Sequence, residues 1–306
     1  MPRAVKPVLQ IVTPEIDPSI KKRSGFAVLV GRSNVGKSTL VNNLIGTKVA
    51  ITSPKPQTTR QMIHGVLHDP RGQIVFVDTP GVFEKAHDRL TKRLNSTARE
   101  SLRDIDVVVY VADPTRPIGN EEHIVLRLLD TTDVPKIMAI NKTDLRNPPF
   151  VSSYMAMADR FDKVLEVSGL RGRGLKPLID AVFELLPEGE PVYPEYQFSN
   201  IEHKAWLAEL IREKVMIQMH EEIPYSVTVE IREMEKRANG ILFIKAAILT
   251  NAERYRGMII GAGGRKVKEI GTAARKELSQ IMDCKVYLEL EVETDERWED
   301  RLTETL

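Results

Sequence analysis

The sequence predicts an α/β protein of two domains, in which a doubly wound parallel sheet precedes a smaller α+β domain. Apolar strand patterns alternate with helical patterns up to about residue 186, which is typical of a parallel sheet. A proline-rich stretch interrupts the alternation at 187–194, and a different order of elements follows it. The length of 306 residues and the apolar content of 42% are enough for two cores.

The composition narrows the class of protein before any motif is considered. The net charge is +1, so a surface for nucleic acid must be a local patch. Cys284 is the only cysteine and can form no intramolecular disulfide, which fits a reducing cytosol. No apolar run approaches the roughly 18 residues of a membrane span. Residues 1–22 are rich in proline, lack an apolar signal core, and are predicted to form a flexible tail.

A glycine-rich motif between a strand and a helix predicts a phosphate site. The apolar run 26–30 indicates a buried strand, and helical spacing over 37–45 indicates the helix. The pattern G-x-x-x-x-G-K-[ST] between them directs backbone N–H groups and a helix dipole at a polyphosphate. Lys37 is expected to reach the β- and γ-phosphates, and the Ser38 hydroxyl to bind Mg²⁺. The nucleotide-binding residues predicted here are Gly31, Arg32, Ser33, Asn34, Val35, Gly36, Lys37, Ser38 and Thr39.

The loop 48–60 is predicted to respond to the γ-phosphate. It is polar, interrupted by prolines, and ends just before a strand candidate at 62–67. A threonine in this place can complete the Mg²⁺ shell only when a γ-phosphate is present, which makes the loop a switch. Thr59 is favoured for this role, and Thr58 is the alternative.

The segment after the buried strand 73–77 supplies a second contact with the same phosphate. An aspartate at the carboxyl end of a parallel strand lies near the phosphate loop and can hold Mg²⁺ through water. Asp78 occupies this place, and the N–H of Gly81 can donate to the γ-phosphate and lose this bond on hydrolysis. The predicted contacts are Asp78, Thr79, Pro80 and Gly81, and the predicted metal ligands are Ser38, Thr59 and Asp78.

A second motif predicts which base is bound. Helical spacing at 90–102 and near 121–129 alternates with strands at 106–112 and 136–140. The Asp144 carboxylate that follows can accept two hydrogen bonds from guanine, whereas adenine would leave it unpaired. Asn141 can tie this loop to the phosphate loop, and the stem of Lys142 can lie along the base. The predicted base-binding tetrad is Asn141, Lys142, Thr143 and Asp144.

One further strand and one helix complete the first domain. The strand 163–167 ends in Ser168, Gly169 and Leu170, where a backbone N–H can donate to guanine O6. These three residues are therefore predicted to contact the nucleotide. A helix at 175–186 follows.

These signals together resemble one class of protein. The segments GRSNVGKST, QTTR, DTPG, NKTD and SGL, in this order and spacing, resemble a translation-factor-related GTPase. Such proteins often have alanine at the position of Gly169. Val82 stands where many of them carry a water-positioning glutamine, so the chain is similar to the branch with a hydrophobic residue there. In that branch a phosphate-loop asparagine helps to hold K⁺, and Asn34 occupies its place. The resemblance implies Mg²⁺ and K⁺ as cofactors, and the catalytic set Asn34, Lys37, Thr59 and Gly81.

Two arginines offer an alternative source of positive charge for hydrolysis. Arg32 and Arg60 lie in loops that are predicted to be near the phosphates. Their guanidinium groups would then act as internal arginine fingers. The resemblance favours K⁺ held partly by the Asn34 side chain.

The second domain follows the linker with a new set of elements. Apolar residues at helical spacing over 205–215 predict a helix, and strands are predicted at 226–231 and 241–249 with Asn239-Gly240 as the hairpin turn. A glycine loop, a helix at 266–282 and a strand at 285–290 complete the domain.

The glycine loop resembles the G-x-x-G loop of a KH domain. The order helix, strand, strand, helix, helix, strand resembles the type II form, in which a single-stranded nucleic-acid backbone approaches the glycines. Apolar side chains such as Ile260 and Val267 can face the bases, and cations lie near the phosphates. The predicted RNA-binding residues are Ile260, Gly261, Ala262, Gly263, Gly264, Arg265, Lys266 and Lys268.

A doubly wound P-loop GTPase domain joined to a type II KH domain is similar to the bacterial Era GTPases. This resemblance implies a tail at 1–22, a GTPase domain at 23–188, a linker at 189–199 and a KH domain at 200–306. It also implies binding of GTP and GDP, binding of 16S ribosomal RNA near its 3′ end, and a role in maturation of the small ribosomal subunit. A monomeric, cytoplasmic protein with peripheral contact to the inner membrane is the expected form.

Two other classes of function are compared with this one. An RNA-binding assembly protein could use its nucleotide pocket only for structure, but intact Lys37, Ser38 and Asp78 argue against it. An ATP-driven RNA enzyme is disfavoured by Asp144, which matches guanine. The hypothesis that remains is a GTP-hydrolysing enzyme in which hydrolysis times RNA binding.

Overall fold

The computed structural model describes residues 21–82, 84 and 89–305. The chain divides into two compact units. The first holds the residues up to Ala50 together with Thr59–Asn200, and the second holds Ile51–Thr58 together with the residues from Ile201 onward. Most of the predicted tail, residues 1–20, lies outside the described residues. The predicted domain boundaries stay predictions, and the grouping of Ile51–Thr58 with the second unit was not anticipated.

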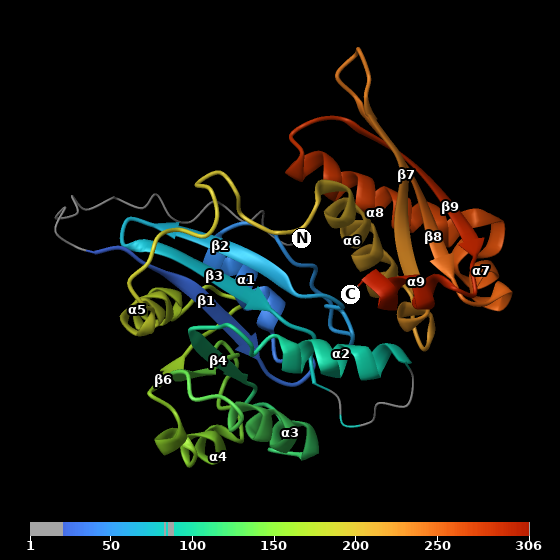
Figure 1. Cartoon of the computed structure of the whole chain (residues 1–306). Helices are drawn as coiled ribbons and strands as arrows, with labels where there is room; N and C mark the ends of the chain where they lie inside the picture. Colours follow the sequence, from blue (N-terminus) through green and yellow to red (C-terminus); the bar gives the residue numbers. More distant parts are fainter. Residues whose placement is uncertain (1–20, 83, 85–88, 306) are drawn as a thin grey trace. The chain divides into compact units, whose positions relative to one another are not determined.

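A six-stranded sheet forms the centre of the first unit, with the strand order β2-β3-β1-β4-β5-β6 (Figure 1). The inner strands β1, β3, β4 and β5 are almost fully buried and rich in valine and isoleucine, as expected for a sheet covered on both faces, whereas the edge strands β2 and β6 are only partly buried. The strands are β1 (Arg23–Val30), β2 (Ile63–Asp69), β3 (Gly72–Asp78), β4 (Val107–Ala112), β5 (Lys136–Ile140) and β6 (Lys163–Glu166).

The prediction of a doubly wound parallel sheet is confirmed for five of these strands. β1 pairs in parallel with β3 and β4, and β5 pairs in parallel with β4 and β6. β2 is the exception, because it runs antiparallel to β3. A two-residue turn separates these two strands, which is too short for the crossover that a parallel pair requires. The sheet is therefore mixed.

Helices cover both faces of this sheet. One face is packed by residues of α2, α3 and α4, including Ala98, Leu126 and Tyr154, while α1 and α5 pack against the sheet from the other side. The helices are α1 (Lys37–Ile45), α2 (Arg89–Glu100), α3 (Asn120–Leu129), α4 (Val151–Met155) and α5 (Leu175–Leu185), with a 3-10 turn at Ala158–Arg160. The short α4 and the 3-10 turn were not predicted, because five and three residues are too few for a helical period to show.

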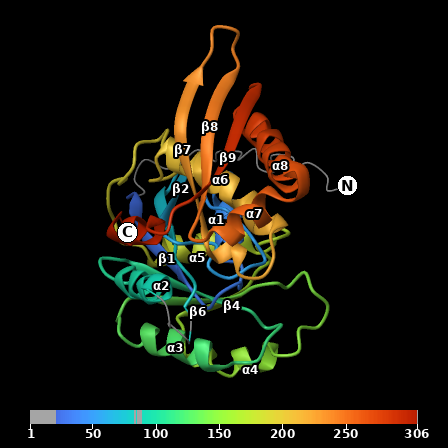
Figure 2. The same ribbon diagram turned by 90° about the vertical axis from the view of Figure 1, so that its right-hand side faces the viewer.

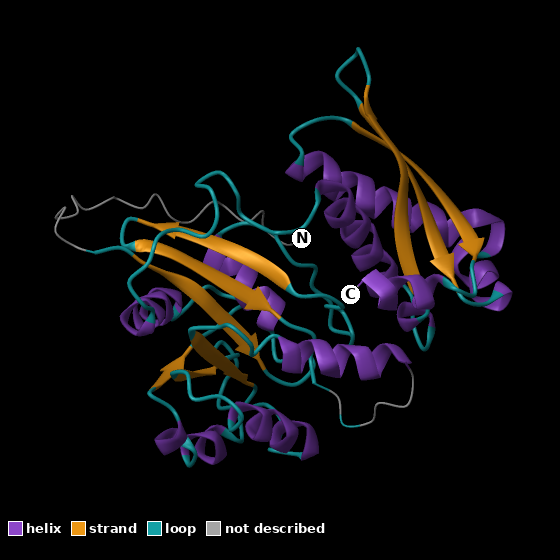
Figure 3. Ribbon diagram, viewed as in Figure 1, coloured by secondary structure: helices purple, strands orange, loops and turns teal. Residues whose placement is uncertain are grey.

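The predicted linker is docked on the first unit. Its backbone continues the sheet beyond β2: Val66 N–H donates to Phe198 O at 3.0 Å, and Gly65 forms an isolated antiparallel bridge with Ser199. Gln73, with 1% of its surface exposed, accepts from the N–H groups of Val192 and Tyr193 and donates to Tyr193 O at 2.7 Å. The loop that runs beside β2 in Figure 3 is thus held by backbone and side-chain bonds.

A three-stranded sheet with the order β7-β8-β9 is the central element of the second unit (Figure 2). β7 (Val227–Lys236) and β8 (Leu242–Thr250) form the predicted hairpin, with Gly240 at φ 79° in the turn. β9 (Val286–Thr294) is parallel to β8. β7 and β9 are each longer than predicted, because their outer ends alternate charged residues with apolar ones.

Helices lie on both faces of this smaller sheet. α6 (His203–Gln218) and α8 (Arg265–Ile281) cover the face that carries Ile244 and Ile248, and Cys284 packs against the same core. α9 (Trp298–Thr305) was not predicted; Trp298 packs on Ala247 and Leu249, which point to the opposite face. The remaining elements are α7 (Glu253–Ile260) and 3-10 turns at Ile223–Tyr225 and Ala262–Gly264.

Two buried charged residues of α6 hold the segment Ile51–Thr58 within the second unit. Glu213 accepts from the N–H of Thr52 at 2.7 Å, and Arg212 donates to the carbonyl oxygen of Thr58. Both side chains are at most 2% exposed, so each needs its partner. In the part of the chain that the structure describes, no helix is long and apolar enough to cross a membrane.

Candidate nucleotide and RNA sites

The loop Gly31–Ser38 joins β1 to α1 and fits the geometry of an anion-binding loop. Asn34 and Gly36 adopt left-handed backbone conformations, with φ of 63° and 98°. Side chains would not fit at two of its glycines: a Cβ on Gly31 would lie 2.7 Å from Val111 O, and one on Gly36 would lie 2.6 Å from Asn141 Nδ2. The loop therefore turns tightly and presents N–H groups before the start of α1.

Lys37 lies across this loop. Its ammonium donates to the carbonyl oxygens of Gly31 and Arg32 at 3.0 and 3.1 Å, and only 6% of the residue is exposed. Burial lowers the pKa of Lys37 from 10.5 to about 8, although Asp78 and Glu122 oppose this shift. A polyphosphate in the loop would place negative charge beside this ammonium and would raise its pKa again.

Three oxygen-bearing side chains converge beside Lys37. Ser38 Oγ donates to Asp78 Oδ2 at 2.6 Å, while Thr59 Oγ1 lies 2.9 Å from Ser38 Oγ and 3.2 Å from Asp78 Oδ2. The other carboxylate oxygen, Asp78 Oδ1, is buried and has no hydrogen-bond partner. Burial raises the pKa of Asp78, although Lys37 and the two hydroxyl groups oppose this rise. Hydroxyl and carboxylate oxygens around a buried, unpartnered acceptor suit a small divalent cation.

The structure distinguishes the two candidate threonines of the switch loop. Thr59 reaches Ser38 and Asp78, as described above. The Thr58 hydroxyl instead donates to Lys55 O at 2.7 Å, within its own segment. The arrangement of side chains therefore favours Thr59 as a metal ligand.

The segment after β3 lies against the phosphate loop. A Cβ on Gly81 would lie 2.7 Å from Ser33 Cα, so only glycine allows this approach. Thr79 Oγ1 donates to Leu29 O at 2.8 Å, which fixes the turn to β1. Val82 is 4% exposed and belongs to an apolar core cluster. Its side chain carries no donor or acceptor, so it cannot orient a water molecule.

The base-binding loop is fastened to the phosphate loop through Asn141. Its Nδ2 donates to Val35 O at 2.8 Å, and its Oδ1 accepts from the N–H of Gly169 at 2.8 Å. Asp144 Oδ1 accepts from Ser168 Oγ at 2.6 Å, and the Thr143 hydroxyl donates to Val167 O. Asn141 therefore connects three of the four segments that sequence analysis assigned to the nucleotide.

Two residues of α1 contribute to this guanine site without a motif to mark them. Asn43 Nδ2 donates to Gly169 O at 2.8 Å. A Cβ on Gly169 would lie 3.2 Å from Leu40 N, so glycine allows the segment 168–170 to pack closely on α1. Leu170 is 68% exposed beside this site. The sequence signal for Asn43 is its place one turn beyond Thr39 on the phosphate-loop helix.

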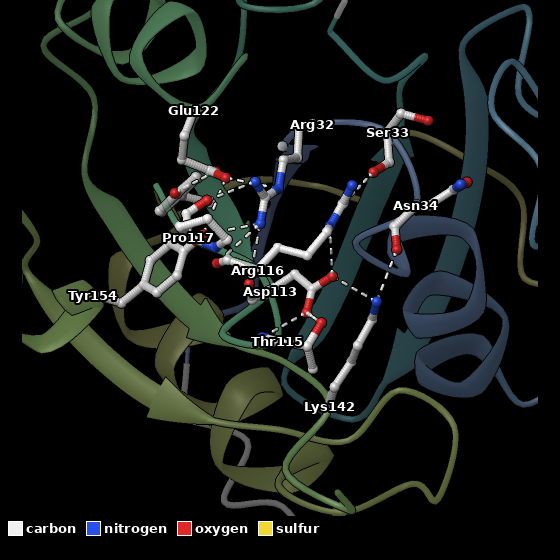
Figure 4. A network of polar contacts seen from close by, with 12 residues as sticks. Arg32, Ser33, Asn34, Asp113, Thr115, Arg116, Pro117, Glu122, Lys142 and Tyr154 are labelled. Atoms are coloured by element: carbon white, nitrogen blue, oxygen red, sulfur yellow. Dashed lines mark hydrogen bonds and ion pairs between the residues drawn. The ribbon is translucent and has the colours of Figure 1, made fainter. Parts of the chain in front are cut away.

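Arg32 points away from the phosphate site, into a buried network (Figure 4). Its Nε lies 2.9 Å from Glu122 Oε2, and its terminal nitrogens donate to the Tyr154 hydroxyl at 3.3 Å and to Pro117 O at 3.0 Å. Glu122 is completely buried and also accepts from the Tyr110 hydroxyl. The hypothesis that Arg32 is an arginine finger is therefore wrong, because these contacts hold its guanidinium group in the buried network and away from the phosphate site. Arg60 is 4% exposed and stays a candidate.

The glycine loop of the second unit joins α7 to α8. Gly261, Gly263 and Gly264 all have left-handed φ values, of 71°, 59° and 75°. α8 begins directly after them at Arg265, so its N–H groups are presented beside the loop. Arg265 and Lys268 are exposed, and Lys266 and Ile260 are half-buried. The loop thus combines open backbone, cations and a partly exposed apolar side chain, as a single-stranded nucleic acid requires.

Comparisons with known proteins agree with this geometry. Residues 26–142 match the family model described as 50S ribosome-binding GTPase, and residues 222–299 match the KH domain model. GTPase Era of Halothermothrix orenii is 41% identical over 284 residues, which span 91% of this chain and 95% of the relative.

Two solved structures resemble the whole chain. One is Era in complex with MgGDPNP and nucleotides 1506–1542 of 16S ribosomal RNA, with a TM-score of 0.86, 36% identity, and coverage of 92% of this chain and 96% of that one. The other is an Aquifex aeolicus Era variant bound to GDP and AlF4⁻, with a TM-score of 0.85, 36% identity, and coverage of 91% and 96%. The similarity extends over both units and both candidate sites.

Proposed function

The chain belongs to the Era family of GTPases, and on that premise we propose how its two units divide the work. The first unit binds and hydrolyses GTP. The second binds RNA near the 3′ end of 16S ribosomal RNA, where a relative holds nucleotides 1506–1542, and acts in maturation of the small ribosomal subunit. The observation that carries this proposal is the convergence of Ser38, Thr59 and Asp78 beside Lys37, in a chain that also presents the glycine loop.

Mg²⁺ fits the oxygen cluster of the first unit, and MgGDPNP is the ligand of the related structure. Ser38 and Thr59 would be direct ligands, and Asp78 would hold the ion through water. The ion would neutralise charge on the β- and γ-phosphates. Lys37 would leave the loop carbonyls and pair with the same phosphates, and the Gly81 N–H would donate to the γ-phosphate. Loss of that phosphate would release both Gly81 and Thr59.

K⁺ is the proposed source of the remaining positive charge. Val82 is apolar, and Arg32 is paired with the buried Glu122. Neither side chain therefore stabilises the charge that develops between the β- and γ-phosphates. The family resemblance implies, and we propose here, that the side-chain oxygen of Asn34 would hold K⁺ in part. Asn34 has a left-handed backbone conformation, which residues other than glycine rarely adopt. Arg60 is the remaining alternative.

Replacement of Na⁺ by K⁺ at constant ionic strength tests this account. We expect multiple-turnover GTP hydrolysis to be faster in K⁺, and Asn34→Ala to abolish the difference while GDP binding persists. Arg60→Gln is the matched variant for the alternative and should keep the K⁺ effect. Equal wild-type rates in the two salts would refute the role of K⁺.

The hydrolytic function itself is tested by turnover with purified full-length chain. We expect GTP to be converted to GDP and phosphate over many cycles, and Asp78→Asn to stop turnover because the metal cluster loses its carboxylate. Labelled GTP should be displaced by GDP and not by ATP. A wild-type chain that binds GTP but releases no phosphate would instead favour a structural nucleotide.

The proposed RNA contact uses the backbone of the glycine loop. The α8 amino terminus and the exposed Arg265 and Lys268 would meet phosphates, and Ile260 would face a base. A synthetic RNA with the sequence of the 3′ end of 16S ribosomal RNA should bind more tightly than a scrambled RNA at the same salt concentration. Equal binding would limit the proposal to RNA of any sequence.

The remaining parts of the proposal rest on the family resemblance alone. They are a monomer, a cytoplasmic location and a peripheral contact with the inner membrane. Analytical ultracentrifugation tests the first, and cell fractionation tests the other two. Flotation with vesicles of bacterial lipids would show whether the purified chain itself binds the membrane.

A further inference from the structure

Asp113 lies directly after β4 and is completely buried, yet no motif marks it. Its Oδ1 accepts from the N–H and the hydroxyl of Thr115, at 3.1 and 2.6 Å. Its Oδ2 accepts from Lys142 Nζ at 2.6 Å and lies 3.5 Å from Arg116 Nε. Figure 4 shows both cations beside this one carboxylate. Burial would raise the pKa of Asp113, but Lys142 and Thr115 outweigh it, so the carboxyl stays ionised.

The two cations reach from Asp113 to successive carbonyl groups of the phosphate loop. Arg116 donates to Ser33 O at 2.8 Å, and Lys142 Nζ donates to Asn34 O at 3.0 Å. Figure 4 shows the two bonds side by side. Asp113 is thus connected to the loop through two independent bridges, one from its own segment and one from the base-binding loop.

These bridges determine the direction of two N–H groups. In a trans peptide the C=O and the N–H point to opposite sides. A carbonyl of Ser33 drawn toward Arg116 turns the N–H of Asn34 the other way, and a carbonyl of Asn34 drawn toward Lys142 does the same for the N–H of Val35. The carbonyls on either side are held as well, by Lys37 and by Asn141. The N–H groups of Asn34 and Val35 therefore point away from these held carbonyls, to the side on which a phosphate would be bound.

We propose that Asp113 is a positioning residue of the nucleotide site, which acts through Arg116 and Lys142 to orient the peptides that follow Ser33 and Asn34. Without the carboxylate the two cations lose their common anchor, and the left-handed conformation at Asn34 loses its support. Each phosphate contact would then require the loop to be ordered first, which lowers affinity. This inference rests on the nucleotide site of the proposed function.

The test compares Asp113→Asn with a matched variant at the other end of the same strand. Asp106 precedes β4, and its carboxylate accepts from the N–H of Phe26 at 2.7 Å, far along the strand from the phosphate loop. Asp106→Asn therefore replaces a charged acceptor by a neutral amide without touching the site. The full-length chain is titrated with fluorescent GDP, with GDP and IDP as competitors, below the melting temperature of every variant.

We expect Asp113→Asn to weaken GDP and IDP equally, by about tenfold, because charge-assisted bonds to the phosphate loop are lost. Asp106→Asn should lower the melting temperature and leave both affinities unchanged. Arg116→Gln should weaken both ligands by about threefold, and should have less effect when Asp113→Asn is already present. Because Arg116 is partly exposed, this variant tests the proposal even if Asp113→Asn does not fold.

Other outcomes overturn the proposal. Wild-type GDP affinity in Asp113→Asn would show that the phosphate loop binds the nucleotide without support from Asp113. Wild-type GDP affinity in Arg116→Gln would contradict the proposal as well. An equal loss of affinity in Asp106→Asn would reduce Asp113 to a residue that stabilises the fold. A changed ratio of GDP to IDP affinity would place its effect on the base. Failure of the wild-type chain to bind GDP would refute the proposed function instead.

Discussion

Asp144 and Ser168 come from loops that follow different strands, and their side chains meet at 2.6 Å. The hydroxyl fixes the rotation of the carboxylate, so that its acceptor edge is ready for the N1–H and N2–H₂ groups of guanine. On the proposed function, Asp144 would therefore select the base, and Ser168 would orient the Asp144 carboxylate for this task.

Asp144→Asn is expected to weaken GTP binding by one to two orders of magnitude, or on the order of 1–3 kcal/mol for a lost bidentate pair. One acceptor oxygen becomes a donor that faces the donors of guanine. Xanthosine triphosphate, which carries an acceptor at C2, should bind better than it does to the wild type. Competition titrations with the two nucleotides measure both effects.

Ser168→Ala is the companion variant, and should weaken GTP by a smaller factor without improving xanthosine triphosphate. An unchanged preference for GTP in Asp144→Asn would remove Asp144 from the base site.

Lys37 gives the nucleotide-free protein a specific pH dependence. Its pKa is lowered from 10.5 to about 8, so the folded chain releases this proton before the unfolded chain does. Between these two pH values the unfolded chain binds more protons, and the stability of the nucleotide-free fold rises with pH. Bound phosphate reverses the shift, because it favours the charged ammonium.

GDP binding near pH 8 should therefore take up a fraction of a proton, since part of the free protein carries neutral Lys37 at this pH. Calorimetry in two buffers of different ionisation enthalpy measures this uptake. Lys37→Arg is the control and should show none, because arginine stays charged. Binding to the wild type without proton uptake would contradict the lowered pKa.

At the scale of elements, β3 and the linker are joined by one side chain. Gln73 is buried and makes three hydrogen bonds to the backbone of Val192 and Tyr193. Gln73→Leu keeps the size of the side chain and removes its polar atoms. It should lower the free energy of unfolding by about 1–3 kcal/mol, because backbone groups near it lose their partners.

Chemical denaturation measures this loss, and limited proteolysis should show faster cleavage within 190–198. Gln197→Leu is the matched control, since that side chain bonds only to Ser199 O, two residues away. Equal stability of the two variants would mean that Gln73 does not hold the linker.

The elements that the sequence predicted are those whose pattern is long or whose motif is strong. β1, β3, β4 and β5 are apolar runs, and α8 has a clear helical period over 17 residues. The direction of β2 was missed because alternation of apolar residues does not distinguish parallel from antiparallel pairing. The place of Ile51–Thr58 was missed because two buried charged residues of a distant helix determine it.

The candidate site divides in the same way. Residues that must touch phosphate, metal or base lie in motifs, because the ligand dictates both their type and their spacing. Arg116 and Asn43 instead bond to the backbone of those motifs, and Asp113 is proposed to act on it through Arg116 and Lys142. Many residue types at many positions can orient a backbone in this way. The role of these three residues follows only from distances in the folded chain. Arg32 shows the converse, since its place in a motif suggested a catalytic role that its buried contacts exclude.

At the scale of the whole molecule, the two binding sites belong to separate units and should fail separately. Replacement of Gly261 and Gly264 by aspartate puts negative side chains where the RNA backbone should pass, at positions with left-handed φ. RNA binding should be lost while GTP affinity stays at the wild-type value. Gel-shift and nucleotide titrations at one fixed salt concentration measure the two affinities.

A single replacement at Gly257, in α7 just before the glycine loop, serves as the control, because an added Cβ there meets nothing within 4 Å. Gly257→Ala should keep RNA affinity. Wild-type RNA affinity in the double aspartate variant would place the RNA surface elsewhere.

We expect the docked linker also to protect the first unit from self-association through β2. β2 is the last strand of its sheet, and an uncovered edge strand offers its N–H and C=O groups to any other strand in solution. The segment around Phe198 and Ser199 occupies those groups at Gly65 and Val66. A fragment that stops at Leu186 would expose this edge and should aggregate at high concentration, whereas one that extends to Asn200 would keep it covered. The connection between the two units is thus also a cover for the edge of the first sheet.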